Sequence, residues 1–314
     1  ISSANSAASS AAKGESLADT VRMASAYADL LVIRHPREGA ATVAAQYAGV
    51  PVINAGDGAH EHPTQTLCDL FAIRREKGAL QGLTVAVLGD LKGGRTVHSL
   101  VYALARFGAH IVTMPASGME LPRHVALRLR HEFGSIFLPS KQLSALHPLA
   151  TGAYLPPGAT AAPRKIDVLY VTRFQKERGA PALLDYPVVN ADFLSPPAFH
   201  EALVLHPLPR VGELAPAFDT DRRAGYFRQA SLGMPVRMAL TALLLDAAPD
   251  QSLEPLEGGF CQESETRRET SLACSNPNCI TRDSQEIPNT EPKFRHDPAG
   301  PGALRCFYCE HEVT

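Results

Sequence analysis

A histidine and a glutamine, His62 and Gln65, flank the predicted start of a helix, where they could bind an anionic substrate. Pro63 favours a helix start at this point, because a proline in the first helical turn gives up no hydrogen bond. The free N–H groups and the positive dipole end of a helix N-terminus attract anions. An imidazole and an amide at such a site suit a substrate that carries both a phosphate and a carbonyl group.

Charged residues follow several predicted strands. Arg34 comes directly after the apolar run 30–33, at the same kind of strand end as the loop before His62, and this agreement favours a site there. The glycine-containing loop 89–96 matches neither a P-loop nor GxGxxG, so it is as typical of a tight turn as of an anion site. The charged stretch 172–178 is equally consistent with a site and with a solvated loop.

The stretch 206–210, His-Pro-Leu-Pro-Arg, predicts a rigid turn after a strand. Two prolines on either side of Leu208 restrict the backbone, and either proline could follow a cis peptide bond. Such a turn fixes backbone carbonyl groups in space.

The order of these elements predicts the fold class. Strands alternate with helices, which indicates parallel α/β sheets. Apolar runs predict strands over 30–33, 50–54, 83–88, 110–114, 166–171 and 202–205, and we expect the first of them to be buried. Helical periodicity indicates helices over 15–28, 39–48, 63–78, 97–104, 123–133 and 234–247. In the third helix we expect one core-facing side, formed by Leu67, Leu70, Phe71 and Ile73. The region 149–165 has no periodicity, and we interpret it as a loop or insertion.

Four cysteines cluster at the end of the chain, whereas Cys68 and Cys261 stand alone. The pairs are Cys274-x4-Cys279 and Cys306-x2-Cys309, a spacing typical of a tetrahedral zinc site on two short knuckles. A module this small buries little core, so the metal would supply much of its folding energy. We expect one structural zinc ion per chain.

Composition excludes several classes of protein. The 314 residues suffice for two or three domains, and 30 Lys and Arg against 32 Asp and Glu leave no basic footprint for nucleic acid. No apolar run is long enough to span a membrane. The chain begins at Ile1 in a Ser/Ala-rich run that does not resemble a signal peptide, and we expect that the sequence starts in the middle of a gene. Clustered thiols favour a reducing, cytoplasmic compartment.

Seven stretches of this chain resemble the catalytic chain of aspartate transcarbamoylase, in that family's order and over residues 1 to about 247. They are Lys13-Gly-Glu-Ser-Leu-Ala-Asp-Thr, Arg34-His-Pro, Asn54-Ala-Gly-Asp-Gly, His62-Pro-Thr-Gln, Gly89-Asp-Leu-Lys-x-Gly-Arg-Thr-Val-His-Ser, Thr172-Arg-x-Gln-x-Glu-Arg and His206-Pro-Leu-Pro-Arg. The segment from Cys274 to Cys309 is similar to the zinc domain of the same enzyme's regulatory chain, so the chain resembles a catalytic–regulatory fusion.

The resemblance implies an α/β fold of two doubly wound parallel-sheet domains, the first one incomplete, followed by a small zinc-ribbon-like domain with four cysteine ligands. The implied limits are 1–75 for a partial carbamoyl-phosphate-binding domain, 76–231 for an aspartate-binding domain, 248–271 for a linker and 272–314 for the zinc domain. The helix 232–247 is expected to pack back on the first domain.

The resemblance also implies transfer of a carbamoyl group from carbamoyl phosphate to L-aspartate, an early step of pyrimidine synthesis. The positions that match carbamoyl-phosphate contacts are Arg34, His62, Gln65, Ser9 and, through their backbone, Leu208 and Pro209. The positions that match aspartate contacts are Arg95, Arg173, Gln175 and Lys13. His62, Arg34 and Lys13 are the implied catalytic residues, and no catalytic cofactor is expected. Lys13 and Ser9 match a mobile loop that enters a neighbouring subunit's site in a trimer.

Four departures from the family pattern qualify these expectations. A phosphate-gripping Ser-Thr-Arg-Thr motif would precede residue 1, so we expect the fragment as given to be inactive, whereas the full-length protein would be active. Ala12 stands beside Lys13 where a second lysine is common. The stretch 149–165 replaces an expected helix, and the nucleotide-binding domain of the regulatory chain is missing.

Three alternatives remain at this level. One is another transcarbamoylase, such as an ornithine enzyme, although Arg95 and Arg173 favour a dicarboxylic amino acid because a guanidinium pairs with a carboxylate through two hydrogen bonds. A second is a non-catalytic, transcarbamoylase-like scaffold that docks through its zinc module. A nucleic-acid-binding zinc protein is the third and is disfavoured by charge.

Overall fold

The computed structural model describes residues 13–174, 186–247, 266–269, 271–296 and 304–313. The chain divides into two compact units, of which the first comprises residues 1–64, 237–252 and 264–314, and the second comprises residues 65–236 and 253–263. Each unit is described by itself, and the domain limits given above remain predictions. Among the described residues, no helix is long and apolar enough to cross a membrane.

The first unit begins with a small βαβ arrangement. Its elements are α1 (Leu17–Ser25), β1 (Leu31–His35), α2 (Ala40–Tyr47) and β2 (Val52–Asp57), followed by the start of α3 (Pro63–Lys77). Strands β1 and β2 pair in parallel, as predicted. The expectation of a buried first strand is wrong, because side chains along β1 alternate between half-buried and exposed, and Val32 is 62% exposed. Among the described strands β1 pairs with β2 alone, so it lacks the neighbours of a central strand.

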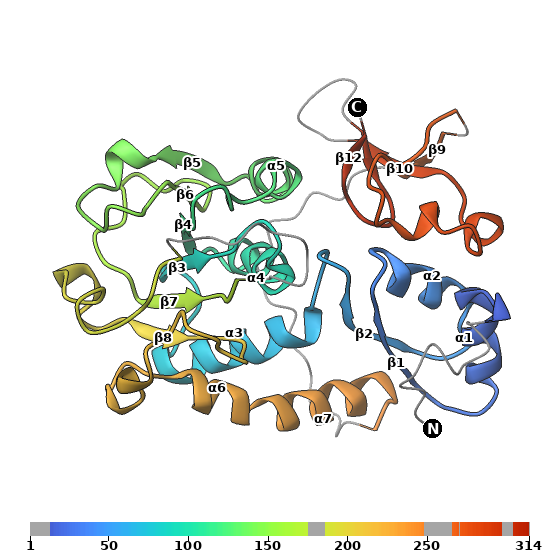
Figure 1. Cartoon of the computed structure of the whole chain (residues 1–314), viewed down its shortest axis with the longest axis horizontal. Helices are drawn as coiled ribbons and strands as arrows, with labels where there is room; N and C mark the ends of the chain where they lie inside the picture. The colour runs from blue at the N-terminus through green and yellow to red at the C-terminus, as the bar shows by residue number, and fades with distance from the viewer. Residues whose placement is uncertain (1–12, 175–185, 248–265, 270, 297–303, 314) are drawn as a thin grey trace. The chain divides into compact units, whose positions relative to one another are not determined.

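The same unit contains the cysteine-bearing module, which is an antiparallel sheet. Its strands are β9 (Thr266–Arg268), β10 (Lys293–His296), β11 (Leu304–Cys306) and β12 (Glu312–Val313), in the order β12-β11-β10-β9. Ala40 and Val43 of α2 share one buried cluster with Cys279, Phe294 and Tyr308 of this module. The module therefore packs on α2 of its own chain (Figure 1).

The second unit is built on a six-stranded sheet in the order β5-β6-β4-β3-β7-β8 (Figure 1). Its elements are β3 (Thr84–Gly89), α4 (Arg95–Arg106), β4 (His110–Pro115), α5 (Arg123–His131), β5 (Ile136–Pro139), β6 (Gly152–Leu155), β7 (Val168–Val171), β8 (Leu203–Leu205), α6 (Tyr226–Ser231) and the start of α7 (Gly233–Leu244). The pairs β4–β3, β3–β7 and β7–β8 are parallel. Alternate residues of these strands enter two separate hydrophobic clusters, so both faces of the sheet are covered.

Two elements of this sheet differ from the sequence prediction. Strand β6 lies inside the stretch 149–165 that was interpreted as a loop, and β5 was not predicted. Strand β6 runs against the rest of the sheet, since it pairs antiparallel with β4 and with β5, and β5 therefore runs in the same direction as β4. The sheet is therefore mixed, with a parallel core and an antiparallel edge.

Helix α3 begins at Pro63, as predicted, but its buried side is not the predicted one. Leu70 and Ile73 are buried as expected, whereas Leu67 is 40% and Phe71 46% exposed. At 3.6 residues per turn, the buried side is centred on Asp69, which has no exposed surface. The apolar spacing predicted the helix correctly but misplaced its core-facing side.

Candidate active site and metal centre

Arg34 stands opposite a bulge in the neighbouring strand. Two residues of β2, Ala55 and Gly56, oppose this single residue in the strand register, and Gly56 has a φ of 112°, which L side chains rarely adopt. A bulge of this kind bends its strand and changes where nearby side chains point. The side chain of Arg34 is exposed at the carboxyl end of β1, where the sequence predicted it.

His62 lies one residue before α3 and is held by local contacts. Its Nδ1 atom is 3.3 Å from Oγ1 of Thr64. The preceding loop is closed by Asp57, whose backbone N–H donates to the carbonyl of Glu61 (3.2 Å) and whose carboxylate accepts the Glu61 N–H (3.3 Å). Because β1 and β2 are parallel, Arg34 and this loop lie at the same edge of their sheet.

The roles of three further predicted site residues remain predictions. Lys13 is exposed at the start of the described chain. Ser9 and Gln175 lie outside the described residues.

Three neighbouring parallel strands of the second unit deliver the other predicted residues to one edge of the sheet. The loop that leads to Arg95 follows β3, Arg173 follows β7, and the 206–210 turn follows β8. The side chain of Arg95 is 9% exposed at the start of α4, and Arg173 is half-buried. The carboxyl ends of parallel strands are where α/β sheets bind ligands.

The loop between β3 and α4 is fixed by short contacts. The Asp90 carboxylate accepts the N–H of Gly93 at 2.7 Å. The hydroxyl of Tyr186 accepts the Asp90 N–H at 2.7 Å and donates to the carbonyl of Thr172 at 2.7 Å, so one side chain ties the loops after β3 and β7 together. Burial raises the pKa of this phenol above its usual value. No local sequence pattern pointed to Tyr186, because its role depends on the folded position of both loops.

The 206–210 turn is anchored by a buried histidine. His206 Nδ1 accepts the backbone N–H of Leu208 at 2.8 Å, so the ring proton lies on Nε2, which donates to Glu213 at 2.8 Å. Burial favours a raised pKa for Glu213, but hydrogen bonds from His206 and from backbone N–H groups together outweigh burial, and the pKa lies below its usual value. The Leu208–Pro209 peptide bond is cis, and Leu208 has a φ of 46°. This confirms the predicted rigid turn.

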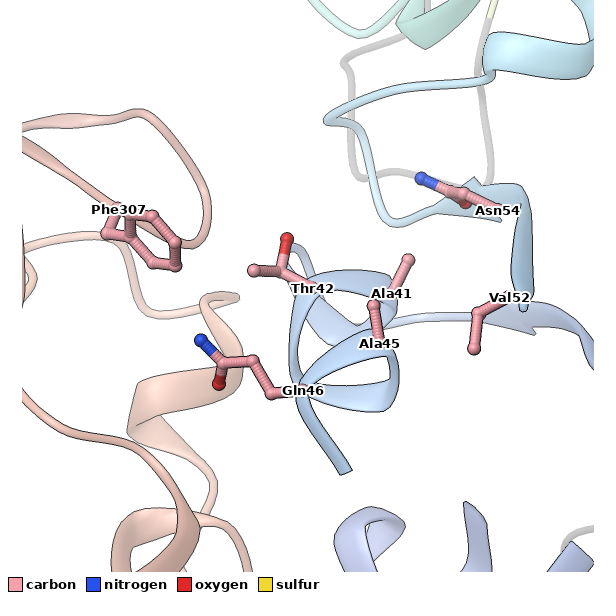
Figure 2. A pocket seen from close by; sticks show the side chains of 7 residues that line it. All are labelled: Ala41, Thr42, Ala45, Gln46, Val52, Asn54 and Phe307. Carbon is pink, nitrogen blue, oxygen red and sulfur yellow. The ribbon is translucent and has the colours of Figure 1, made fainter. Parts of the chain in front are cut away.

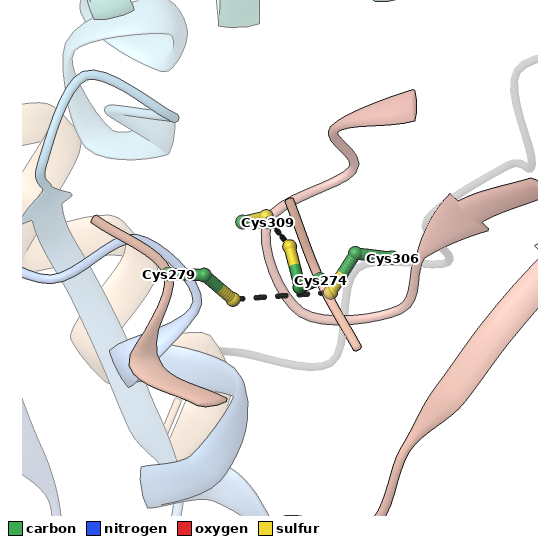
Figure 3. Close-up of side chains that lie close together, drawn as sticks. All are labelled: Cys274, Cys279, Cys306 and Cys309. Atoms are coloured by element: carbon green, nitrogen blue, oxygen red, sulfur yellow. Dashed lines mark hydrogen bonds between the residues drawn. The ribbon is translucent and has the colours of Figure 1, made fainter. Parts of the chain in front are cut away.

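The four clustered cysteines form a candidate metal centre (Figure 3). All four are buried, and their sulfur atoms lie within 4.8 Å of one another. The Cys274–Cys309 and Cys279–Cys306 sulfur pairs are 3.5 and 3.8 Å apart. A tetrahedral ion with metal–sulfur bonds of about 2.3 Å separates its ligands by about 3.8 Å. The residues therefore fit a metal ion of this geometry.

The metal-bearing module contacts the loop after β1 through Glu38, which is 5% exposed. The backbone of Glu38 pairs with the first cysteine knuckle, donating to the Asn278 carbonyl (3.0 Å) and accepting the Ile280 N–H (2.8 Å). Its carboxylate accepts from the Asn276 amide at 2.7 Å and from the Ala59 N–H at 3.3 Å. One carboxylate thus joins the knuckle to the loop that leads to His62.

A buried histidine makes a second link in the same unit. His60 Nδ1 is 3.0 Å from Asp57, and its Nε2 is 4.0 Å from Glu310 of the metal-bearing module. Burial alone would lower the pKa of His60, but its hydrogen bond to Asp57 and the charges of Glu61, Asp57 and Glu310 raise it to about 10. The imidazole is therefore a cation between two carboxylates at neutral pH.

A hollow of about 410 Å³ is lined by residues of α2, β2 and the metal-bearing module (Figure 2). It is lined by Ala41, Thr42, Ala45, Gln46, Val52, Asn54 and Phe307. Thr42 and Gln46 extend from α2 on the side of Phe307. None of the predicted substrate contacts lines this hollow.

Parallel sheets with arginines at their strand ends, together with a buried four-cysteine module, define an α/β protein with a candidate metal centre. The family model "Aspartate/ornithine carbamoyltransferase, carbamoyl-P binding domain" matches residues 1–75. The model "Aspartate carbamoyltransferase regulatory chain, metal binding domain" matches residues 268–314.

The catalytic subunit of aspartate carbamoyltransferase from Lachnoclostridium phytofermentans is 44% identical over 249 residues, which cover 77% of this chain and 76% of that protein. The corresponding subunit from Alkaliphilus metalliredigens is 46% identical over 243 residues (76% and 73%).

The chain is also similar to solved structures of aspartate transcarbamoylases. Aspartate transcarbamoylase from Trypanosoma cruzi in complex with carbamoyl phosphate matches with a TM-score of 0.63 and 38% identity, over 77% of this chain and 74% of that chain. The catalytic subunit of M. jannaschii aspartate transcarbamoylase matches with a TM-score of 0.59 and 38% identity (78% and 76%). The chain belongs to the aspartate carbamoyltransferase family.

Proposed function

We propose that this protein transfers the carbamoyl group of carbamoyl phosphate to the amine of L-aspartate, giving N-carbamoyl-L-aspartate and phosphate for pyrimidine synthesis. The observation that carries the proposal is the shared sheet edge of the second unit, where Arg95, Arg173 and the 206–210 turn follow three neighbouring strands. Two guanidinium groups at one edge suit the two carboxylates of aspartate.

Carbamoyl phosphate is assigned to Arg34, His62 and Gln65, with Ser9 and the backbone of Leu208 and Pro209 as further contacts. The uncharged amine of aspartate attacks the carbamoyl carbon, and negative charge grows on the carbonyl oxygen. His62 and Arg34 stabilise that charge as fixed donors, so catalysis is electrostatic and needs no covalent intermediate. The C–O bond to phosphate then breaks, and the phosphate leaves with the proton that the amine nitrogen loses.

Aspartate is assigned to Arg95, Arg173, Gln175 and Lys13. Holding both substrates together turns a bimolecular reaction into an effectively unimolecular one. Lys13 and Ser9 belong to a loop that we assign to the active site of a neighbouring copy, in a trimer that shares its sites. The exposure of Lys13 supports this assignment, because its side chain is available to another chain.

The metal is proposed to be zinc, one ion per chain, held by Cys274, Cys279, Cys306 and Cys309. Four sulfur ligands close the coordination sphere and leave no position for substrate, so the ion is structural. None of the five described cysteines forms a disulfide, which supports a reducing, cytoplasmic location.

The nearest alternative is carbamoyl transfer to ornithine, and a substrate comparison separates the two. We expect kcat/KM for aspartate to exceed that for ornithine by about 100-fold or more, because a cationic side chain would meet two guanidinium groups. Equal or greater activity with ornithine would contradict the assignment. Absence of transfer to either amino acid would favour the non-catalytic scaffold.

A further inference from the structure

Asp69 is a buried charge that the reaction described above does not use. It lies at the centre of the buried side of α3 and has no exposed surface. Burying a carboxyl group is costly unless hydrogen-bond donors surround it. A charged residue at this place needs a reason that core packing does not supply.

Three donors from three elements converge on this carboxylate. Gln65 of α3 donates its amide N–H to Oδ1 at 2.7 Å, and Gln229 of α6 donates to the same oxygen at 2.6 Å. The hydroxyl of Tyr170 in β7 donates to Oδ2 at 2.8 Å. All of these residues belong to the second unit.

The contact with Asp69 fixes which end of the Gln65 amide faces outward. The nitrogen is held by the carboxylate, and in a planar amide the oxygen then points away from it. A carbamoyl group carries an NH2, which needs an acceptor. In this orientation the side-chain oxygen of Gln65 is available as that acceptor. Oδ1 accepts in either protonation state of Asp69, because a proton on Oδ2 can be donated to the Tyr170 hydroxyl.

The contact with Gln229 extends the same support to the 206–210 turn. Gln229 Oε1 accepts the backbone N–H of His206 at 2.9 Å. His206 in turn accepts the N–H of Leu208 at 2.8 Å. One carboxylate is therefore joined by continuous hydrogen bonds to the Gln65 side chain and to the backbone of the turn.

We propose that Asp69 is a positioning residue for the carbamoyl group. It holds the Gln65 amide oxygen toward the substrate and, through Gln229, holds the 206–210 turn in register with it. This rests on the proposed function, since it concerns the groups assigned to carbamoyl phosphate. It predicts that loss of Asp69 weakens use of carbamoyl phosphate selectively.

The test compares steady-state kinetics of the enzyme and four variants. Asp69→Leu removes the acceptor, Asp69→Asn keeps an acceptor oxygen of the same shape, and Gln229→Met cuts the link to the turn. Thr113→Val is the control, because it removes a buried hydrogen bond (Thr113 to the Gly152 carbonyl, 3.0 Å) elsewhere in the same sheet. KM for carbamoyl phosphate, KM for aspartate and the melting temperature are measured for each.

We expect Asp69→Leu and Gln229→Met to raise KM for carbamoyl phosphate about tenfold and KM for aspartate less than about threefold, with Asp69→Asn close to the original enzyme. Thr113→Val should lower the melting temperature alone. If Asp69→Leu does not fold, the two KM values of Gln229→Met decide. An unchanged KM for carbamoyl phosphate in the folded apolar variants, or equal changes for both substrates, overturns the positioning role. An original enzyme without transfer activity refutes the proposed function instead.

Discussion

Two buried carboxylates, those of Glu38 and Asp69, accept hydrogen bonds from distant parts of the sequence. Glu38 accepts from Asn276, 238 residues away, and Asp69 accepts from Gln229, 160 residues away. A buried polar group left without its partner costs about 1–3 kcal/mol, and more when it is charged. Each of these carboxylates therefore fixes the position of the segments that donate to it.

Asp69 makes the stability of the second unit depend on pH. Burial raises its pKa from 3.8 to about 7, although hydrogen bonds from Gln229, Gln65 and Tyr170 oppose the shift. Between these values the folded state keeps a proton that the unfolded state has lost, so stability falls as pH rises from about 4 to about 7. Asp69→Asn carries no such proton. The variant should gain on the order of 2–4 kcal/mol relative to the original protein over this range.

Urea unfolding of both proteins at about pH 4.5, 6 and 7.5 measures this difference. His200→Ala provides a control, because His200 is exposed and lies outside the Asp69 contacts. A difference between Asp69→Asn and the original protein that stays constant with pH would argue against a raised pKa for Asp69.

Site residues could be predicted where the sequence signal is local, and could not be predicted where their role depends on distant partners. The helix start beside His62 was predicted because proline and the following periodicity act over a few residues. Asp69 could not be assigned a role, since its partners lie 101 and 160 residues away. Its only sequence signal is a charged residue four positions after Gln65 in an apolar helix.

At the level of elements, a glycine allows the start of α2 to pack closely against the metal-bearing module. A Cβ atom at Gly39, the residue before α2, would lie 2.7 Å from Cβ and the carbonyl oxygen of Tyr308. The φ of Gly39 is 85°, which adds backbone strain for any other residue. The contact between α2 and the metal-bearing module therefore requires glycine here.

Gly39→Ala should separate the module from α2. Hydrogen exchange of the Ile280 amide, which donates to the Glu38 carbonyl at 2.8 Å, reports this contact. We expect exchange to accelerate by about tenfold or more, which corresponds to a loss of about 1.4 kcal/mol of local stability. Gly78→Ala is the matched control, because Gly78 has a φ of 83° but open space around its Cβ position. Equal exchange in both variants would contradict the requirement for close packing.

The parallel strands were predictable from sequence, whereas the antiparallel edge was not. After Thr84, the run to Gly89 has no polar side chain, which is typical of a strand buried on both faces. Strand β6 has no such signal and forms by pairing with β4 and β5. Its Gly152 allows close approach of the Phe137 ring, since a Cβ atom would lie 2.6 Å away. Cross-strand contacts of this kind cannot be predicted from the order of residues along one strand.

For the whole molecule, the metal-bearing module is an integral part of the first unit. It shares a buried cluster with α2 and contacts the loop after β1 and the loop after β2. The sequence predicted its four ligands but not where it packs, because the packing depends on complementary surfaces far apart in the chain.

Metal analysis of the purified protein should give about one zinc ion per chain. Cys279→Ser should lower zinc content and expose the amides of β10 and β11 to hydrogen exchange, because metal binding supplies folding energy to a module with little core. Cys68→Ser, at a buried cysteine outside the cluster, should leave zinc content unchanged. Zinc well below one per chain in the original protein would contradict a four-thiolate site.

His62, at the start of α3, is proposed to stabilise negative charge on the carbamoyl group during transfer to aspartate, and His62→Ala tests this role most directly. With both substrates saturating, we expect kcat to fall by about 100- to 1,000-fold, because one fixed donor to the developing oxyanion is lost. His200→Ala, at an exposed histidine, should leave kcat unchanged. A His62→Ala enzyme that is folded and retains the original kcat would contradict the account.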